Sequence, residues 1–536
     1  MADKIIINGD IRTGNPEQPR AEALAVRGGR ISAVGSNADV RRLARAGTEI
    51  LDAGGMLVLP GFIDSHVHLL GGGLSLLGVS LRDAASRDEF IRRVEAAGRD
   101  LPKGEWILNG DWDHQLFNPV ELPRKEWIDP VTADRPVCLN RLDEHMVLAN
   151  SAALRLAGVT PTTPIPPGGD IVKDPVTGDP TGILKDAAMD LVMSVIPEPS
   201  PEKKRRAVRA ALKTASAKGV TSVHDVSGEA GFDVYQELLR EGTLTTRIYF
   251  YVPIASIDDV PGLEPLKKGD SDRLRFGGLK GFVDGSLGSQ TACFDDPYTD
   301  DTRTAGLLGA QMFPEGIMER RILAAAAAGL QTAIHAIGDR ANAIILDIYE
   351  KAAGLNGPGD RRFRIEHAQH LRPADFARFA GLGVIASVQP NHLIDDGRWA
   401  EAKIGPARAA TTYAFRSFLD AGAVLAFGSD WPVAPMDPVL GLYAAVTRAT
   451  LDGKQPGGWV PAEKITVEEA VRAFTVGGAY AEFAEREKGT LTVGKLADFV
   501  VLDLNIFKVA PEKIREAKVL ATICGGTFVH RSCSFK

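Results

Sequence analysis

The sequence predicts an α/β protein: a (β/α)8 barrel of the TIM type, with a composite β-sandwich and an insertion after barrel strand one. Eight apolar runs alternate with helix-like stretches through the middle of the chain, as in a barrel of parallel strands. Short strand-like runs with glycine turns occupy both chain ends, which predicts one sandwich built from the two ends. The first two apolar runs stand far apart in the sequence, and this spacing predicts the insertion.

The sandwich is expected to comprise residues 1–58 and 481–536. Gly28 and Gly29 separate two strand-like runs, which is a hairpin signal. The predicted strands of the N-terminal part are 5–8, 23–26, 30–34 and 49–52. Those of the C-terminal part are 489–491, 498–502 and 522–529.

The barrel is expected to comprise residues 59–480, with the inserted subdomain at about 75–185. Several of its runs are apolar almost throughout, as expected for parallel strands that are buried on both faces. The predicted barrel strands are 58–68, 219–225, 246–252, 279–283, 331–335, 363–367, 383–388 and 423–430. Alanine-rich segments at 318–328 and 374–380 are expected to be helices, and strand-like runs of the insertion lie at 106–109 and 136–140.

The composition excludes several classes of protein. The 62 Lys and Arg residues against 69 Asp and Glu give a net charge of −7, which argues against a nucleic-acid partner. The absence of a run of about 18 apolar residues argues against a membrane span. The four cysteines form no Cys-x-x-Cys pair, which disfavours a disulfide framework and a thiolate zinc site. No signal peptide is evident at the first residues, so a cytoplasmic location is expected.

Polar residues recur at the carboxyl ends of the predicted barrel strands. His66 and His68 end strand one, and their spacing of two puts both side chains on one face. The other strand-end or strand residues of this kind are Lys280 in strand four, His335 in strand five, His367 in strand six and Asp430 in strand eight. All are expected to converge at the C-terminal mouth of the barrel, where barrel enzymes form their active sites.

Imidazoles together with a carboxylate suit zinc or another borderline divalent ion. Four histidines and one aspartate exceed one tetrahedral site, because a catalytic metal keeps one position for water. They fit two ions if a further group bridges them. An ammonium group would repel the metals, but Lys280 becomes a suitable bridge if its amine has captured carbon dioxide as a carbamate. A single strand histidine is more often a core or surface residue than a ligand, Asp430 alone fits a turn or a helix cap, and Lys280 alone fits a surface position. The joint pattern across five strand ends is what indicates a metal site.

Here the chain resembles the amidohydrolase superfamily, and within it the amidohydrolase 3 branch that contains N-substituted formamide deformylases. The matching motifs are Leu-Pro-Gly-Phe-Ile-Asp-Ser-His-Val-His (59–68), Val-Asp-Gly-Ser-Leu-Gly-Ser-Gln-Thr-Ala (283–292), His-Ala-Ile-Gly-Asp-Arg-Ala-Asn (335–342), Arg-Ile-Glu-His-Ala (364–368), Gly-Ser-Asp-Trp-Pro (428–432) and Gly-Lys-Leu-Ala-Asp-Phe-Val-Val-Leu-Asp (494–503). The resemblance extends over essentially the whole chain. Its motifs are specific for the superfamily and the branch, and poorly specific for the substrate.

The resemblance implies a distorted barrel with a composite sandwich and one or two metal ions, usually zinc. It places His66, His68 and Asp430 on the more buried metal. It places His335 and His367 on the second metal, with Lys280 as the carboxylated bridge. Some relatives use a glutamate or a cysteine as the bridge, or hold only one metal, so the number of ions stays open.

The expected reaction is the cleavage of a C–N bond in an amide, an N-formyl compound or a cyclic amide. A divalent metal lowers the pKa of bound water towards about 7, so that a metal-bound hydroxide is available to attack the carbonyl carbon. Asp430 is the expected catalytic residue, taking the proton of the water and delivering it to the leaving nitrogen. The expected partner is a small-molecule substrate, and a homodimer is common in relatives.

Further residues are candidates for roles around the metal. The candidate substrate-binding residues are His145 in the insertion, His224 at the end of strand two, His392 after strand seven, and Trp112. His145 is equally open to a surface or fold-stabilising role, whereas packing is the favoured alternative for His224 and Trp112. Asp284 and Glu366 flank proposed ligands and are expected either to support them through hydrogen bonds or to cap helices.

Three other functions remain open from the sequence. A deaminase of a heterocycle would release ammonia without chain cleavage. A non-hydrolytic decarboxylase or other lyase would use the same scaffold and would evolve carbon dioxide. A catalytically inactive binding protein is disfavoured, because the complete ligand set includes Asp430.

Overall fold

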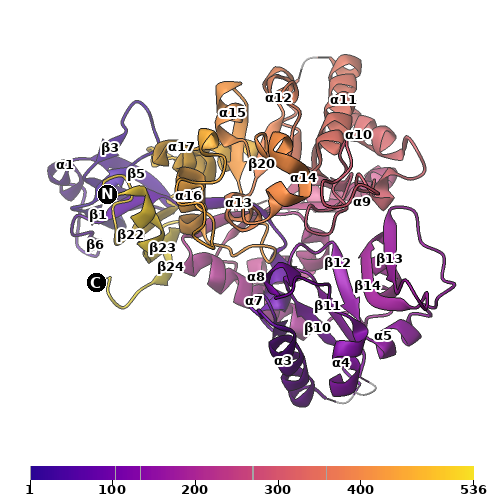
Figure 1. Ribbon diagram of the computed structural model, residues 1–536. Helices are drawn as coiled ribbons and strands as arrows, with labels where there is room; N and C mark the ends of the chain where they lie inside the picture. Colours follow the sequence, from indigo (N-terminus) through magenta and orange to yellow (C-terminus); the bar gives the residue numbers. More distant parts are fainter. Residues whose placement is uncertain (1, 103, 133–134, 269–270, 358, 536) are drawn as a thin grey trace.

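The computed structural model describes residues 2–102, 104–132, 135–268, 271–357 and 359–535. Figure 1 shows three parts: a β-rich part where both chain ends lie, a central α/β part, and a lobe formed by the early, purple segments. No helix among the described residues is both long and apolar enough to cross a membrane.

The central part is an eight-stranded parallel barrel sheet in the order β21-β20-β19-β18-β17-β16-β15-β8. Its strands are β8 (Phe62–Val67), β15 (Val220–Asp225), β16 (Arg247–Pro253), β17 (Leu274–Phe282), β18 (Gln331–Ala336), β19 (Arg364–His367), β20 (Ile385–Val388) and β21 (Val424–Phe427). All eight predicted runs are confirmed as strands. The first run is divided at Gly61: β7 (Leu57–Pro60) joins the sandwich and only β8 joins the barrel.

The barrel closes between its first and last strands. The Asp430 amide donates to His66 O at 2.7 Å, the His68 amide donates to Trp431 O at 2.8 Å, and Val67 forms a parallel bridge with Trp431. These bonds fix the residues after β21 against the end of β8. The two strand ends that carry His66, His68 and Asp430 are therefore locked together by the backbone.

Helices cover the outside of the barrel (Figure 1). α7 (Pro201–Ala217) illustrates the sequence logic: Ser200 caps it by accepting from the Lys203 amide at 3.2 Å, and Pro201 occupies its first turn. The predicted alanine-rich helices are confirmed as α10 (Ile317–Ala327) and α12 (Asp375–Leu382). Other helices of the barrel region are α2 (Leu69–Ser75), α8 (Phe232–Arg240), α9 (Val260–Lys268), α11 (Asp339–Asn356), α13 (Pro390–Asp396), α14 (Ala400–Ala409), α15 (Phe415–Asp420), α16 (Pro438–Thr447), α17 (Val467–Arg472) and α18 (Gly478–Ala481).

The chain ends form two sheets, in the orders β5-β4-β1-β6 and β24-β23-β22-β7-β2-β3. The first contains β1 (Lys4–Ile7), β4 (Ala23–Arg27), β5 (Arg30–Gly35) and β6 (Glu49–Asp52). The second adds β2 (Asp10–Arg12), β3 (Arg20–Ala21), β22 (Phe499–Leu502), β23 (Val519–Cys524) and β24 (Thr527–Arg531) to β7. The second sheet thus combines strands from both chain ends.

The predicted turn at Gly28 and Gly29 joins β4 to β5, and both glycines have positive φ, 56° and 75°. Two predictions for the C-terminal part are wrong in detail. Residues 489–491 form no strand, although the Leu491 amide donates to Thr13 O at 2.7 Å. The predicted run at 522–529 spans parts of two strands, because the chain reverses at Gly525 and Gly526.

The insertion carries its own sheet, in the order β13-β14-β12-β11-β10-β9. Its strands are β9 (Val79–Ser80), β10 (Ile107–Gly110), β11 (Val137–Asn140), β12 (Met146–Ala149), β13 (Gly169–Lys173) and β14 (Pro180–Asp186). The helices are α3 (Arg87–Asp100), α4 (Lys125–Thr132) and α5 (Ser151–Leu156). The predicted strand-like runs at 106–109 and 136–140 are β10 and β11. The domain boundaries given above stay a prediction.

Candidate metal centre

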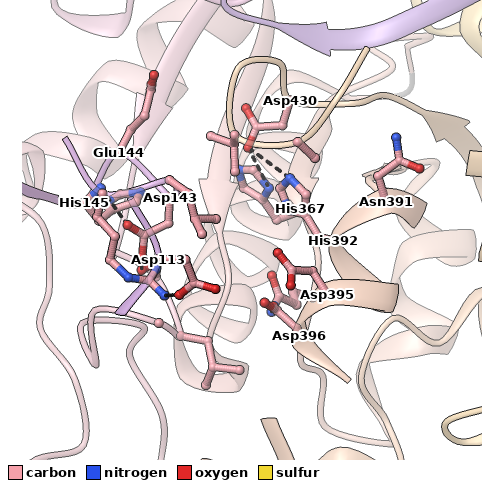
Figure 2. Close-up of a pocket in the computed structure, with 18 of the residues that line it drawn as sticks. Asp113, Asp143, Glu144, His145, His367, Asn391, His392, Asp395, Asp396 and Asp430 are labelled. Carbon is pink, nitrogen blue, oxygen red and sulfur yellow. Dashed lines mark hydrogen bonds and ion pairs between the residues drawn. The ribbon is translucent and has the colours of Figure 1, made fainter. Parts of the chain in front are cut away.

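A cavity of about 620 Å³ lies at the C-terminal mouth of the barrel, between strand ends and the insertion. All six predicted metal ligands line it: His66, His68, Lys280, His335, His367 and Asp430. Figure 2 shows Asp430 facing His367 and His392, with His145 and Asp143 to one side of them. A volume of this size is typical of a small-molecule site.

Asp430 stands at the centre of the ligand group. One carboxylate oxygen, Oδ1, lies 3.3 Å from Nε2 of both His66 and His68. The other oxygen, Oδ2, lies 3.7 Å from Nε2 of His392 and 4.0 Å from Nδ1 of His367. The geometry therefore offers two groups that are compact enough to hold an ion, His66–His68–Asp430 and His367–His392–Asp430.

Hydrogen bonds fix the nitrogen that three of the histidines present. Nδ1 of His66 lies 2.5 Å from Oε2 of Glu366, which leaves Nε2 for a ligand. Nδ1 of His367 lies 2.9 Å from the side-chain oxygen of Gln389, which again leaves Nε2. Supporting contacts of this kind orient the histidines of metal sites and set their tautomers.

His335 is oriented the other way round. Its Nε2 lies 3.1 Å from Gly285 O, so Nδ1 is the nitrogen left for a ligand. Its ring packs edge-on against the ring of His367, with centroids 4.5 Å apart. His335 thus lies beside His367 as predicted, although neither of the two compact groups includes it.

Lys280 is buried and lines the same cavity as the histidines, with its Nζ 4.5 Å from the centre of the Phe282 ring. Burial, which penalises the ammonium form, lowers the pKa of Lys280 to about 8. A sizeable neutral fraction is therefore present near pH 8. The neutral amine is the form that captures carbon dioxide.

The ligand atoms fit a metal by their burial and their chemistry. Among the described residues, buried atoms without a hydrogen-bond partner include Nε2 of His66, Nε2 of His392, Nζ of Lys280 and Oδ1 of Asp430. Such clustered unsatisfied atoms are rare in folded proteins and call for an explanation such as an ion. Burial lowers the pKa of His66 to about 4, and the neutral imidazole that results is the form that binds metals.

His145 lines the cavity from the insertion, as predicted for a substrate contact. Its Nδ1 lies 2.6 Å from Oδ1 of Asp186, and its ring centre lies 5.0 Å from that of His335. Burial opposes the charge of this imidazole, but the Asp186 carboxylate prevails and raises the pKa of His145 to about 9. The insertion therefore places a cationic group beside the predicted metal ligand His335.

The structure does not bring the other two predicted contacts to the cavity. The His224 ring is fully buried lower in the barrel, where Nδ1 accepts from Arg364 at 2.8 Å and Nε2 lies 3.4 Å from Glu482. Trp112 belongs to the core of the insertion and donates from Nε1 to Leu139 O at 2.9 Å. Neither residue lines the cavity, and the ring nitrogens of both face partners inside the protein.

The flanking carboxylates divide the two predicted roles between them. Glu366 supports His66 directly. Asp284 instead accepts three backbone N–H groups, from Cys293 at 2.8 Å, Ile337 at 3.0 Å and Gly338 at 2.8 Å, and so ties its loop to the start of α11.

Two supporting residues escaped the sequence prediction. Gln389 orients His367, and Arg364 forms a bidentate ion pair with Glu366. A signal for Arg364 was available, since an arginine at an interior position of a barrel strand, two residues before Glu366, must share the inward face with it. Gln389 follows strand seven and carried no such signal.

A parallel eight-stranded barrel with clustered histidines and an aspartate at its mouth is an arrangement typical of metal-dependent hydrolases. The chain belongs to the amidohydrolase family, whose sequence profile matches residues 49–530. The predicted resemblance to this family is confirmed.

Individual relatives cover nearly the whole chain. Protein LONG AFTER FAR-RED 3 of Arabidopsis thaliana is 42% identical, over 98% of this chain and 91% of its own length. N-substituted formamide deformylase of Arthrobacter pascens is 29% identical, over 98% of both chains. The crystal structure of an uncharacterized metal-dependent hydrolase from Pyrococcus horikoshii has a TM-score of 0.77 and 30% identity, and covers 95% of this chain and 99% of its own.

Proposed function

We propose that the protein hydrolyses a C–N bond of a small molecule, in an amide, an N-formyl compound or a cyclic amide, with one or two divalent metal ions. The observation that carries the proposal is the position of Asp430. Its carboxylate faces four histidines at the floor of the cavity, within 3.3–4.0 Å of a nitrogen of each. A carboxylate there reaches both the metal ligands and a substrate in the cavity.

His66, His68 and Asp430 would hold the first ion, which we expect to be zinc. His335 and His367 would hold the second through Nδ1 and Nε2 respectively, with Lys280 as a carboxylated bridge. A bound divalent ion supplies a nucleophilic water at neutral pH and polarises the carbonyl oxygen. The burial of Lys280 favours the neutral amine that the carbamate requires.

Asp430 would move the proton. Its Oδ1 is buried and accepts no hydrogen bond from the described residues, so a lone pair is available to take the proton of the attacking water. The same carboxylate would then give this proton to the leaving nitrogen, which balances the hydrolysis.

His145 and His392 would bind the substrate. His145 is held by Asp186 through Nδ1, so Nε2 is the atom left to donate to a substrate oxygen. His392 lines the same cavity, and its Nε2 has no hydrogen-bond partner among the described residues. The name of the Arthrobacter relative supports the bond class, since removal of a formyl group from an N-substituted formamide breaks a C–N bond.

The test begins with metal content per chain, by elemental analysis of protein purified without chelator, beside Lys280→Ala. Close to two ions, falling in the variant, would support the bridged site. N-formyl, N-acyl and cyclic amides are then screened for release of both products. Release of ammonia without chain cleavage would favour a deaminase instead, and evolution of carbon dioxide a lyase. No metal after reconstitution would overturn the proposal.

A further inference from the structure

Arg364 is a charged residue inside the barrel that takes no part in the proposed reaction. Its side chain is fully buried at the start of β19 and does not line the cavity. Its guanidinium makes hydrogen bonds to Glu366 Oε1 (2.7 Å) and Oε2 (3.0 Å), Ser65 O (2.5 Å), Ser387 Oγ (2.9 Å), Tyr251 Oη (2.9 Å) and His224 Nδ1 (2.8 Å). One side chain thus ties together five strands of the barrel.

The first link runs from Arg364 to the metal ligand His66. The bidentate pair holds both oxygens of Glu366, and Oε2 of Glu366 lies 2.5 Å from Nδ1 of His66. An ionised Glu366 accepts a hydrogen bond from the Nδ1–H group of His66, which leaves the lone pair on Nε2 for the ligand group. A carboxylate buried in a barrel stays ionised only if it is paired, and Arg364 is its paired cation.

The second link is to the backbone and to the next strand. Arg364 also bonds the carbonyl oxygen of Ser65, the residue before His66, so it fixes the backbone of this ligand as well as its ring. On the other side it bonds Ser387, whose carbonyl oxygen accepts from the side chain of Gln389 at 3.2 Å. Gln389 in turn orients His367. Both strand-end ligands are therefore connected to one guanidinium.

The remaining guanidinium nitrogen of Arg364 donates to His224 and Tyr251. His224 accepts from it and faces Glu482, and Glu482 is paired with Lys488 at 2.7 Å. This arrangement uses His224 as an acceptor for the guanidinium, which accounts for a histidine at the end of a barrel strand that does not reach the cavity.

We infer that Arg364 is a positioning residue of the metal centre, which sets the orientation of His66 through Glu366 and of His367 through Ser387 and Gln389. The inference rests on the metal-dependent function proposed above. The positioning role requires the planar guanidinium of arginine, because a lysine ammonium is a point charge that cannot hold both Glu366 oxygens together with Ser65 O.

The chain offers a matched control. Arg247 is also a buried arginine at the start of a barrel strand, with a bidentate pair to Asp498 at 2.7 and 3.0 Å, but on the sandwich side of the barrel. Arg247→Lys reproduces the loss of a buried fork away from the ligands. It separates a general loss of stability from an effect on the metal centre.

The experiment compares wild type, Arg364→Lys, Glu366→Gln and Arg247→Lys as full-length chains. Each is loaded with Zn²⁺, and the metal affinity is measured by competition with a chromogenic chelator. Co²⁺-loaded samples give the absorption spectrum of the ligand field. We expect Arg364→Lys and Glu366→Gln to bind the metal about 10–100-fold more weakly and to change the Co²⁺ spectrum. Arg247→Lys should lose thermal stability and keep both metal readouts.

Wild-type metal affinity in a folded Arg364→Lys variant would overturn the inference. If Arg364→Lys does not fold, the test uses Glu366→Gln, which keeps the shape of the side chain and removes its charge. Unchanged metal affinity in Glu366→Gln would also overturn the inference. An equal loss of metal affinity in Arg247→Lys would show that the loss in Arg364→Lys comes from reduced stability, and this result would also overturn the inference. A wild type that binds metal but cleaves no C–N bond overturns the proposed substrate class alone, whereas one that binds no metal overturns both.

Discussion

Nδ1 of His145 lies 2.6 Å from Oδ1 of Asp186, and the backbone repeats the contact, since the Asp186 amide donates to His145 O at 3.2 Å. His145 directly precedes β12 and Asp186 is the last residue of β14, and these are adjacent antiparallel strands of the insertion. The insertion therefore delivers a histidine with a fixed orientation and its own counter-charge to the wall of the cavity. This is the feature by which the insertion would take part in catalysis.

Asp186→Asn should lower kcat/KM by about 10- to 100-fold, because it removes a charge-assisted hydrogen bond that orients His145. The decrease in kcat/KM should be largest at alkaline pH. The side-chain amide of the Asp186→Asn variant carries no charge and therefore no longer keeps the His145 imidazole protonated there. Steady-state kinetics between pH 6 and 10 measure this. Asp190→Asn, which replaces a nearby carboxylate outside the cavity, is the control. Unchanged kcat/KM, or a fall confined to the acid end of the range, would contradict the proposed role.

The same pair should make the stability of the metal-free protein depend on pH. The pKa of His145 is raised in the folded protein to about 9, from an ordinary value of 6.5. A raised pKa means that the stabilisation is fully present below pH 6.5 and is lost as the pH rises through about 9. The free energies of unfolding in urea of the metal-free wild type and of metal-free His145→Gln should therefore differ most at pH 6 and converge near pH 10. Parallel curves would contradict the assignment.

Asp430→Asn should keep most of the metal and lose activity by about 100- to 10,000-fold, because the amide still offers an oxygen ligand but no longer shuttles a proton. Elemental analysis and kcat are measured on the same sample. Asp437→Asn is a suitable control, since Asp437 caps α16 and pairs with Lys218 at 2.6 Å outside the ligand group. Full activity in Asp430→Asn would remove the proton shuttle from the mechanism.

Carbamate formation at Lys280 should make metal uptake depend on bicarbonate and on pH. With a pKa of about 8, the neutral amine is the minority at pH 7 and the majority at pH 9. Reconstitution of the metal-free protein should therefore take up the second ion faster at pH 9 with bicarbonate than at pH 7 without it. Lys280→Arg, which keeps the charge but forms no carbamate, should show neither dependence. Equal uptake under all conditions would exclude the bridge.

The convergence of the six predicted ligands on one cavity was predictable because it follows from periodicity. Each predicted ligand lies at or near the carboxyl end of an apolar run, and parallel strands bring those ends to one mouth. The structure adds contacts that no run of sequence displays. His66 meets Glu366 across 300 residues, and this pairing depends on which strands of the closed barrel face one another.

His224 shows where strand-end reasoning fails. The residue lies at the end of β15 as predicted, but its ring is fully buried and its Nδ1 accepts a hydrogen bond from Arg364. The number of ions depends on whether Lys280 is carboxylated, and the substrate depends on loops and on the insertion, whose side chains meet only in the folded protein. Periodicity alone does not determine them.

Trp112 and Trp399 should respond in opposite ways to truncation. Trp112 is fully buried in the insertion core and donates to Leu139 O, so Trp112→Ala should lower the free energy of unfolding by about 3–5 kcal/mol. The KM of the Trp112→Ala variant should change little if the insertion stays folded. Trp399 lines the cavity, so Trp399→Ala should raise KM at a small cost in stability. Thermal unfolding and steady-state kinetics of both variants test the pair. A raised KM in a stable Trp112→Ala variant would instead support the predicted role of Trp112 in substrate binding.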